Sequence, residues 1–307
     1  MTDPLTSQTP ASVLGARVAV DAAGPLPKVD DLGLSYAKAQ AFDWQRQRSH
    51  AKWNDMAGTL TGRPGARWVL ETHAIVGVVG EQVLLAIELE VEKTIVKAAI
   101  DRLPDADFKH KPSVAAHYAR SLRFFAEGQS NAIVIALHGL ANLGVRTLEF
   151  DSDISTDDLR KLGMSRTDFA PGSLSRRSWV SWTQKLVDSV ITGASARSVP
   201  VQEFAAKLGL LAGEQAIIDL LDLRNTQYHR WRGESAGVTG IAFGELPAAD
   251  ILASGQAVDF GGELLPPYSQ GQDTLDDVVV TGRQALDAFV LHMEPLLETW
   301  GKTLPRA

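Results

Sequence analysis

The sequence predicts a mainly α-helical bundle, and three observations support this prediction. Several long segments place apolar residues at helical spacing, and hydrophobic residues make up 45% of the 307 residues, enough for a sizeable core. No repeat of fixed period is visible. We therefore expect an N-terminal extension over residues 1–77 and a helical bundle over 78–307, with an insertion at 233–271 before the last helix.

The N-terminal extension has a mixed pattern. Residues 1–35 are interrupted by proline and glycine, and the β-branched run Ala16–Val20 allows a short strand but no helix. A helix is expected over Tyr36–Met56, where aromatic and basic side chains indicate one apolar and one charged side. Gly62 and Pro64 are expected to end it. The sequence assigns no role to this extension.

The first half of the bundle contains the most apolar helices. Apolar residues at helical spacing predict a long helix over Glu71–Leu103. Two helical units, Ser113–Ala126 and Ser130–Phe150, are expected on either side of Gly128. Little of the circumference of the second unit is polar, so we place it at the centre of the bundle.

The second half is expected to contain three further helices. Pro171 and Gly172 mark a break before them, and Pro200 precedes the second. The expected ranges are Ser178–Ile191, Val201–Arg232 and Thr274–Trp300. Between the last two, residues 233–271 are rich in Gly and Pro and contain two short apolar runs, which either pair as a hairpin or cover the bundle.

Composition excludes several classes of site. The formal net charge of −7 argues against a broad basic surface for nucleic acid, so any contact with RNA must be local. The absence of cysteine excludes disulfides, thiolate nucleophiles and Cys-based zinc sites. No phosphate-binding glycine loop or metal-ligand spacing is apparent, and we expect neither cofactor nor metal.

The chain is expected to be soluble and cytoplasmic, with no contact to a membrane. Residues Met1–Pro10 lack the basic and apolar regions of a signal peptide. The most apolar stretches are interrupted by polar residues such as Glu81, Glu88 and His138, so neither reaches the roughly 20 apolar residues of a membrane span.

A concentrated polar cluster ends the predicted helix Val201–Arg232. Within the nine residues Arg224–Arg232 lie three arginines, one histidine, one asparagine, one tyrosine and one tryptophan. Arg224 and Tyr228 share a helix face, as do Asn225 and His229, whereas Arg224 and His229 are about 140° apart around the axis. Both of the latter can still border one cleft.

The pattern Arg224-Asn225-x-x-x-His229 resembles the Arg-polar-x-x-x-His signature of the HEPN superfamily, the higher eukaryotes and prokaryotes nucleotide-binding domains. The resemblance implies an up-and-down helical bundle that forms a homodimer. It also implies RNA cleavage without a metal, with the motifs of two protomers meeting in a cleft. Roles in RNA-directed defence or as a toxin follow from it, with a protein antitoxin or regulator as a further partner.

The chemistry of these residues suits RNA cleavage independently of the resemblance. A histidine titrates near neutral pH, so His229 can take the proton of a 2′-hydroxyl or protonate the leaving oxygen. Arg224 can fork onto phosphate oxygens and stabilise the charge that gathers there. Asn225 can orient His229 or the phosphate by hydrogen bonds.

Four neighbouring residues are candidates for binding single-stranded RNA. Aromatic and guanidinium groups stack on unpaired bases or contact flanking phosphates, which favours a single strand over a duplex. The candidates are Tyr228, Arg230, Trp231 and Arg232.

A structural interpretation of this cluster remains open. Basic residues at the end of a helix complement the helix dipole, and here they can also pair with Asp219 and Asp222. A looser Arg-to-His pair, Arg67 and His73, lacks the polar residue after the arginine and precedes a long helix. We interpret that pair as structural.

A stripe of polar residues follows one face of the apolar helix Ser130–Phe150. Asn131, His138, Asn142 and Arg146 recur at intervals of seven, four and four residues. The stripe either forms a hydrogen-bonded core network or packs beside the motif, in which case His138, Asn142 and Arg146 orient it.

Three functions therefore remain from the sequence. The first is a metal-independent endoribonuclease of HEPN type. The second is a non-catalytic helical module that binds RNA, a nucleotide or a protein, which the acidic net charge favours. The third is an interaction protein whose N-terminal tryptophans, Trp44, Trp53 and Trp68, dock a partner.

Overall fold

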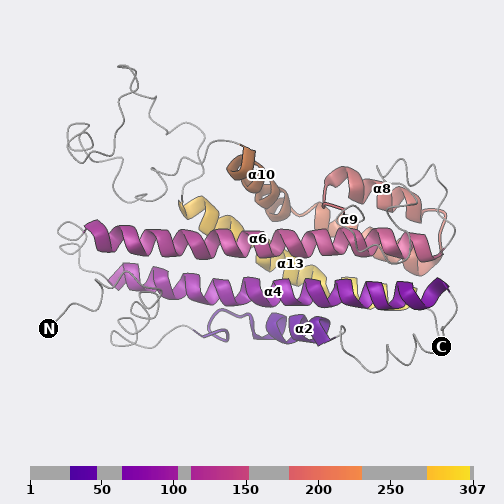
Figure 1. Ribbon diagram of the computed structural model, residues 1–307, viewed down its shortest axis with the longest axis horizontal. Coiled ribbons are helices and arrows are strands. Elements are labelled where there is room, and N and C mark those ends of the chain that lie inside the picture. The colour runs from indigo at the N-terminus through magenta and orange to yellow at the C-terminus, as the bar shows by residue number, and fades with distance from the viewer. Residues whose placement is uncertain (1–27, 47–63, 103–111, 152–179, 230–274, 305–307) are drawn as a thin grey trace, which may run out of the picture. The chain divides into compact units, whose positions relative to one another are not determined.

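The computed structural model describes residues 28–46, 64–102, 112–151, 180–229 and 275–304. Every regular element among them is an α-helix (Figure 1), which confirms the prediction of a mainly α helical bundle. The helices are α2 (Ser35–Arg46), α4 (Pro64–Arg102), α6 (Pro112–Asp151), α8 (Gln184–Ala194), α9 (Val199–Ala212), α10 (Gln215–His229) and α13 (Leu275–Thr303). The expected strand Ala16–Val20 and the apolar runs within 233–271 lie outside the described residues.

The chain divides into two compact units, each assembled from separated stretches of sequence. Unit 1 comprises Met1–Lys28, Leu89–Gly128 and Asp222–Arg283. Unit 2 comprises Val29–Glu88, Gln129–Leu221 and Gln284–Ala307. Helices α4, α6, α10 and α13 each contribute residues to both units. The predicted boundary between residues 77 and 78 stays a prediction.

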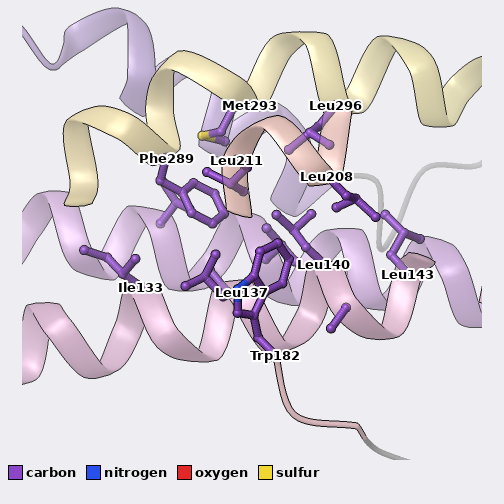
Figure 2. Close-up of a cluster of buried hydrophobic side chains, with 14 of the residues drawn as sticks. Ile133, Leu137, Leu140, Leu143, Trp182, Leu208, Leu211, Phe289, Met293 and Leu296 are labelled. Carbon is purple, nitrogen blue, oxygen red and sulfur yellow. The ribbon is translucent and has the colours of Figure 1, made fainter. Parts of the chain in front are cut away.

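The core of unit 2 surrounds the second half of α6. Ile133, Leu137 and Leu140 of this helix are at most 1% exposed. Figure 2 shows them gathered with side chains from α9, α13 and the segment before α8, namely Leu208, Leu211, Phe289, Met293, Leu296 and Trp182. This confirms the prediction that the apolar stretch after Ser130 is central.

Helix α6 is longer than predicted. It runs without interruption from Pro112 to Asp151, whereas two helices separated at Gly128 were expected. A glycine in a helix interior costs only about 1 kcal/mol relative to alanine, which tertiary packing can offset. A Cβ at Gly128 would lie 3.3 Å from Cδ1 of Leu89, so the glycine allows α6 and α4 to approach closely within unit 1.

The start of α4 also differs from the prediction. The helix begins at Pro64 rather than Glu71, because proline is well suited to the first position of a helix, where its missing N–H has no helical acceptor. Its end at Arg102 agrees with the predicted Leu103. In unit 2 a Cβ at Gly80 would lie 2.7 Å from Cβ of Trp44, so α2 packs directly against the α4 backbone.

The single helix predicted over Val201–Arg232 is two helices. Helix α9 ends at Ala212, and the Gly213 N–H donates to the carbonyl of Gly209 at 3.0 Å. The next helix starts after Glu214, whose carbonyl accepts the Ile217 N–H at 3.0 Å. A uniform apolar period over this stretch concealed the break, although glycine commonly ends helices.

The remaining helices differ from the predictions at their ends. Helix α8 starts at Gln184 rather than Ser178, because the Thr183 side chain accepts the Leu186 N–H as an N-cap and 180–182 are not helical. Helix α13 confirms the predicted last helix within a few residues and continues through Pro295. Helix α2 starts one residue before the predicted Tyr36, and residues 47–56 lie outside the described part.

One stretch of α6, Ser121–Leu148, is long and apolar enough to cross a membrane. The protein itself buries 83% of the relevant window. Such burial is typical of the core helix of a soluble protein.

Candidate functional site

The predicted motif lies on the last turns of α10. This helix spans Gln215–His229, so Arg224, Asn225, Tyr228 and His229 belong to it. It forms because Ile217, Leu220 and Leu223 give it a buried face, while Asp219 and Asp222 stay exposed. Arg230, Trp231 and Arg232 lie outside the described residues.

Helical geometry sets the spacing of the motif. Arg224 and His229 are separated by about 7.5 Å along the axis and about 140° around it, whereas Asn225 and His229 share a face. The structure describes the Arg224 side chain but none from Asn225 to His229. Convergence of the guanidinium and the imidazole on one phosphate therefore stays a prediction.

Leu223, next to Arg224, fixes this part of α10 within unit 1. Its side chain is 6% exposed and belongs to a buried apolar cluster. The other members come from α4, α6 and α13 and are Ile95, Val96, Leu122, Phe125, Ala126, Val278 and Val279. Arg224 is only partly buried. Its Nε atom is buried, so only part of the guanidinium can face solvent at the edge of the apolar cluster.

The acidic residues before the motif have contacts of their own. Asp219 Oδ1 accepts a hydrogen bond at 2.8 Å from Nε2 of Gln215, one turn earlier. Asp222 is exposed. Pairing of these carboxylates with the basic end of the helix stays a prediction.

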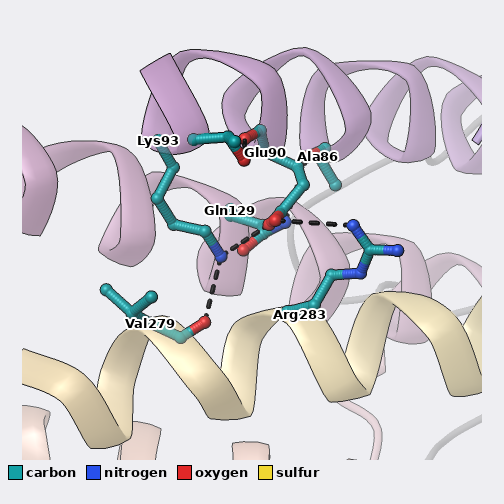
Figure 3. Close-up of polar contacts among 7 residues, drawn as sticks. Ala86, Glu90, Lys93, Gln129, Val279 and Arg283 are labelled. Carbon is teal, nitrogen blue, oxygen red and sulfur yellow. Dashed lines mark hydrogen bonds and ion pairs between the residues drawn. The ribbon is translucent and has the colours of Figure 1, made fainter. Parts of the chain in front are cut away.

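Unit 1 also contains a buried charge cluster that the sequence reasoning missed. Glu90 and Lys93 of α4 are 5% and 2% exposed, and the Lys93 ammonium lies 2.5 Å from Oε2 of Glu90. Figure 3 shows Lys93 also donating to the Val279 carbonyl of α13, at 3.0 Å. Arg283 of α13 approaches Oε1 of Glu90 at 3.5 Å. We call Glu90, Lys93 and Arg283 the charge cluster.

The environment of Lys93 disfavours its charged form. Burial lowers the pKa of the Lys93 ammonium, and the neighbouring Glu90 carboxylate opposes this shift without cancelling it. The available sequence signal was an acid and a base three residues apart on an otherwise apolar helix. Such pairs are usually solvated, and only the tertiary structure shows that this one is enclosed.

The polar stripe of α6 holds an extended segment of unit 2. The Trp182 N–H donates to Nδ1 of His138 at 2.8 Å. The Asn142 amide pairs with both main-chain groups of Val180, accepting from its N–H at 3.0 Å and donating to its carbonyl at 2.8 Å. Nε of Arg146 lies 3.3 Å from Oε2 of Glu71.

These contacts fit the core-network interpretation of the stripe. Two of its members replace the hydrogen bonds that residues 180–182 would make in a helix or a sheet. The role proposed for His138, Asn142 and Arg146 in orienting the motif stays a prediction.

Two other histidines, His73 and His292, contact side chains within unit 2. His73 is 2% exposed, and its ring meets the Trp300 ring edge-on with centroids 4.9 Å apart. His292 of α13 lies 2.7 Å from Oε1 of Glu214 at the turn between α9 and α10. In the described ranges no group of three or more His, Asp or Glu side chains is arranged to hold a metal ion.

No protein-family model, no curated protein and no solved structure matches this chain. The likeness to the HEPN superfamily therefore rests on the motif Arg224-Asn225-x-x-x-His229.

Proposed function

We propose that this protein is an endoribonuclease that cleaves single-stranded RNA without a metal, using Arg224, Asn225 and His229. The main support is the continuous helix through His229, which sets these residues on successive turns at the spacing of the HEPN motif. The partial exposure of Arg224 beside the buried Leu223 agrees with a cation at the rim of a site.

The reaction needs only proton transfer and stabilisation of charge. A base takes the proton of the 2′-hydroxyl, and the 2′ oxygen then attacks the adjacent phosphorus. The bond from phosphorus to the 5′ oxygen breaks, its electron pair stays on that oxygen, and an acid protonates it. The products carry a 2′,3′-cyclic phosphate and a 5′-hydroxyl.

Each motif residue has a role in this scheme. His229 acts as base or acid, and in a homodimer the two copies can divide these roles. Arg224 stabilises the negative charge on the phosphate oxygens. Asn225 orients His229 or the phosphate. Tyr228, Arg230, Trp231 and Arg232 bind neighbouring nucleotides.

The resemblance to the HEPN superfamily also implies a cellular role. We place the protein in RNA-directed defence or among toxins, restrained by a protein antitoxin or regulator. Expression of the unmodified chain should then arrest growth, whereas His229→Ala should not. Light scattering after gel filtration tests the homodimer.

A non-catalytic module is the second candidate, because the net charge of −7 weakens broad attraction to RNA. Such a module would bind RNA, a nucleotide or a protein through the same segment. It predicts retention of RNA on the protein without new chain ends.

One experiment separates the candidates. Purified protein is incubated with mixed single-stranded RNA in the presence of a chelator, alongside His229→Ala and Arg224→Ala, and the product ends are analysed. We expect cyclic phosphate ends from the unmodified protein and a loss on the order of a hundredfold or more in both variants. Intact RNA after binding would favour the module.

Matched controls come from the same chain. Arg123→Ala removes an arginine of unit 1 that pairs with Glu127 at 2.8 Å, and His292→Ala removes a histidine outside the motif. Both should cleave like the unmodified protein. Equal losses in these controls would indicate a general effect of charge or folding and would contradict the assigned roles.

A further inference from the structure

The charge cluster and the motif belong to the same unit. Lys93 donates to the carbonyl of Val279, and the Val279 side chain is part of the apolar cluster that also contains Leu223. Leu223 is followed directly by Arg224. Contacts within unit 1 thus connect the buried ammonium, through α13 and the apolar cluster, to the part of α10 that carries the motif.

Burying charge at this place needs a reason other than stability. Removing ions from water is costly, and apolar side chains of similar volume often stabilise a protein as well or better. An ion cluster differs from apolar packing because its hydrogen bonds have direction. Lys93 is held by Glu90 within α4 and by a main-chain carbonyl of α13, while Arg283 returns from α13 to Glu90. These contacts define the register between the two helices.

We propose that Lys93, together with Glu90 and Arg283, is a positioning residue for the motif. By fixing α13 against α4, the charge cluster fixes the apolar surface on which Leu223 rests, and so the position of Arg224. The positioning role rests on the proposed RNA cleavage only for its effect on rate. Its effect on the end of α10 can be measured without RNA.

Hydrogen exchange of the full-length protein tests the structural part. Lys93→Met removes the buried ammonium but keeps the length of the side chain, and Lys97→Met is the matched control because Lys97 is exposed one turn later on α4. We expect amides 222–229 to exchange about tenfold faster in Lys93→Met and unchanged in Lys97→Met. Amides 199–212 of α9 should be unaffected in both. Unchanged exchange at 222–229, or an equal increase in α9, would overturn the proposal.

RNA cleavage tests the functional part. Lys93→Met should lower kcat about tenfold with KM unchanged, because displaced catalytic groups act on the transition state rather than on binding. A normal kcat alongside faster exchange at 222–229 would reject the positioning role. If the unmodified protein cleaves no RNA, the proposed function fails, and exchange alone decides whether the cluster orders α10.

Arg283→Leu keeps the test decisive if Lys93→Met does not fold. The Arg283 side chain is 30% exposed, so its loss disturbs the interior less. The same amides should exchange faster, by a smaller factor. Unchanged exchange of amides 222–229 in a folded Arg283→Leu protein would contradict a positioning role for Arg283 in the charge cluster.

Discussion

Two groups of buried polar side chains, one in each unit, are held in different ways. In unit 1 the charge cluster encloses side chains that are charged in water, and burial lowers the pKa of Lys93. In unit 2, His138 and Asn142 are neutral groups that pair with the main chain of Val180 and Trp182. Neutral pairs replace missing backbone contacts at moderate cost, whereas buried ions depend on every partner. We therefore expect the charge cluster to be more sensitive to the loss of a single polar group than the contacts of His138 and Asn142 are.

The largest effect is expected from Glu90→Leu. This change leaves Lys93 buried without its carboxylate and removes the partner of Arg283. Breaking a buried pair in this way costs about 3–5 kcal/mol of unfolding free energy. Denaturant unfolding measures it, with Glu88→Leu as control because Glu88 is exposed on the same helix. Equal stability of the two variants would mean that the ions of unit 1 are not critical.

Substitutions at two glycines compare how tightly the helices pack within each unit. Gly80→Ala in unit 2 should cost about 2–3 kcal/mol, because its Cβ would meet the α2 backbone and Cβ of Trp44 at 2.7 Å, so α2 must shift. Gly128→Ala in unit 1 meets only the flexible end of Leu89 at 3.3 Å and gains helix propensity, so its net effect should be under about 1 kcal/mol. Thermal unfolding of both variants measures the difference. Similar melting temperatures would contradict the close approach of α2.

Asn142→Leu tests the neutral network of unit 2. The change removes the partners of the Val180 N–H and carbonyl, and each buried main-chain group left unsatisfied costs about 1–3 kcal/mol. Partial entry of water should bring the total to about 2 kcal/mol. Denaturant unfolding gives the value, and hydrogen exchange at Val180 shows whether the loss is local. Unchanged protection there would show that Asn142 does not hold the segment.

The smallest effect is a dependence of stability on alkaline pH. Burial holds the folded pKa of Lys93 below its ordinary value of 10.5, so between these two pKa values the unfolded chain binds more protons than the folded protein. Because of Lys93, the free energy of unfolding should rise with pH across this window. This stabilisation should be absent below the folded pKa of Lys93. Lys93→Met should lack it, whereas Lys97→Met should retain it. If the unfolding free energies of Lys93→Met and Lys97→Met depend on alkaline pH in the same way, the desolvation of Lys93 is refuted.

Local patterns predicted the helices better than their connections. The apolar period placed α4, α6 and α13 within a few residues at most ends, because a buried helix face needs regular apolar spacing. The sequence predicted a break at Gly128, where the helix continues, and a continuous helix across Gly213, where the helix ends. The two glycines look alike in sequence. Close packing against Leu89 keeps the first in a helix, while the hydrogen-bonded turn at Glu214 stops the second.

The site divides in the same way. Arg224, Asn225 and His229 could be proposed from the sequence because their spacing is local to one helix, and α10 preserves that spacing. The charge cluster could not, because Glu90 and Arg283 are separated by almost two hundred residues. A charged pair on a helix gives no sign of burial until its neighbours are known.

By itself, the sequence determined that this protein is helical, which of its segments are most apolar, and where the candidate motif lies. These properties follow from the side-chain period and from residues close together in the chain. Only the tertiary structure decided that Lys93 and Glu90 are enclosed and that α6 binds residues 180–182 through His138 and Asn142. Burial and partner choice depend on residues distant in the chain, and desolvation acts on a charge only once those residues surround it.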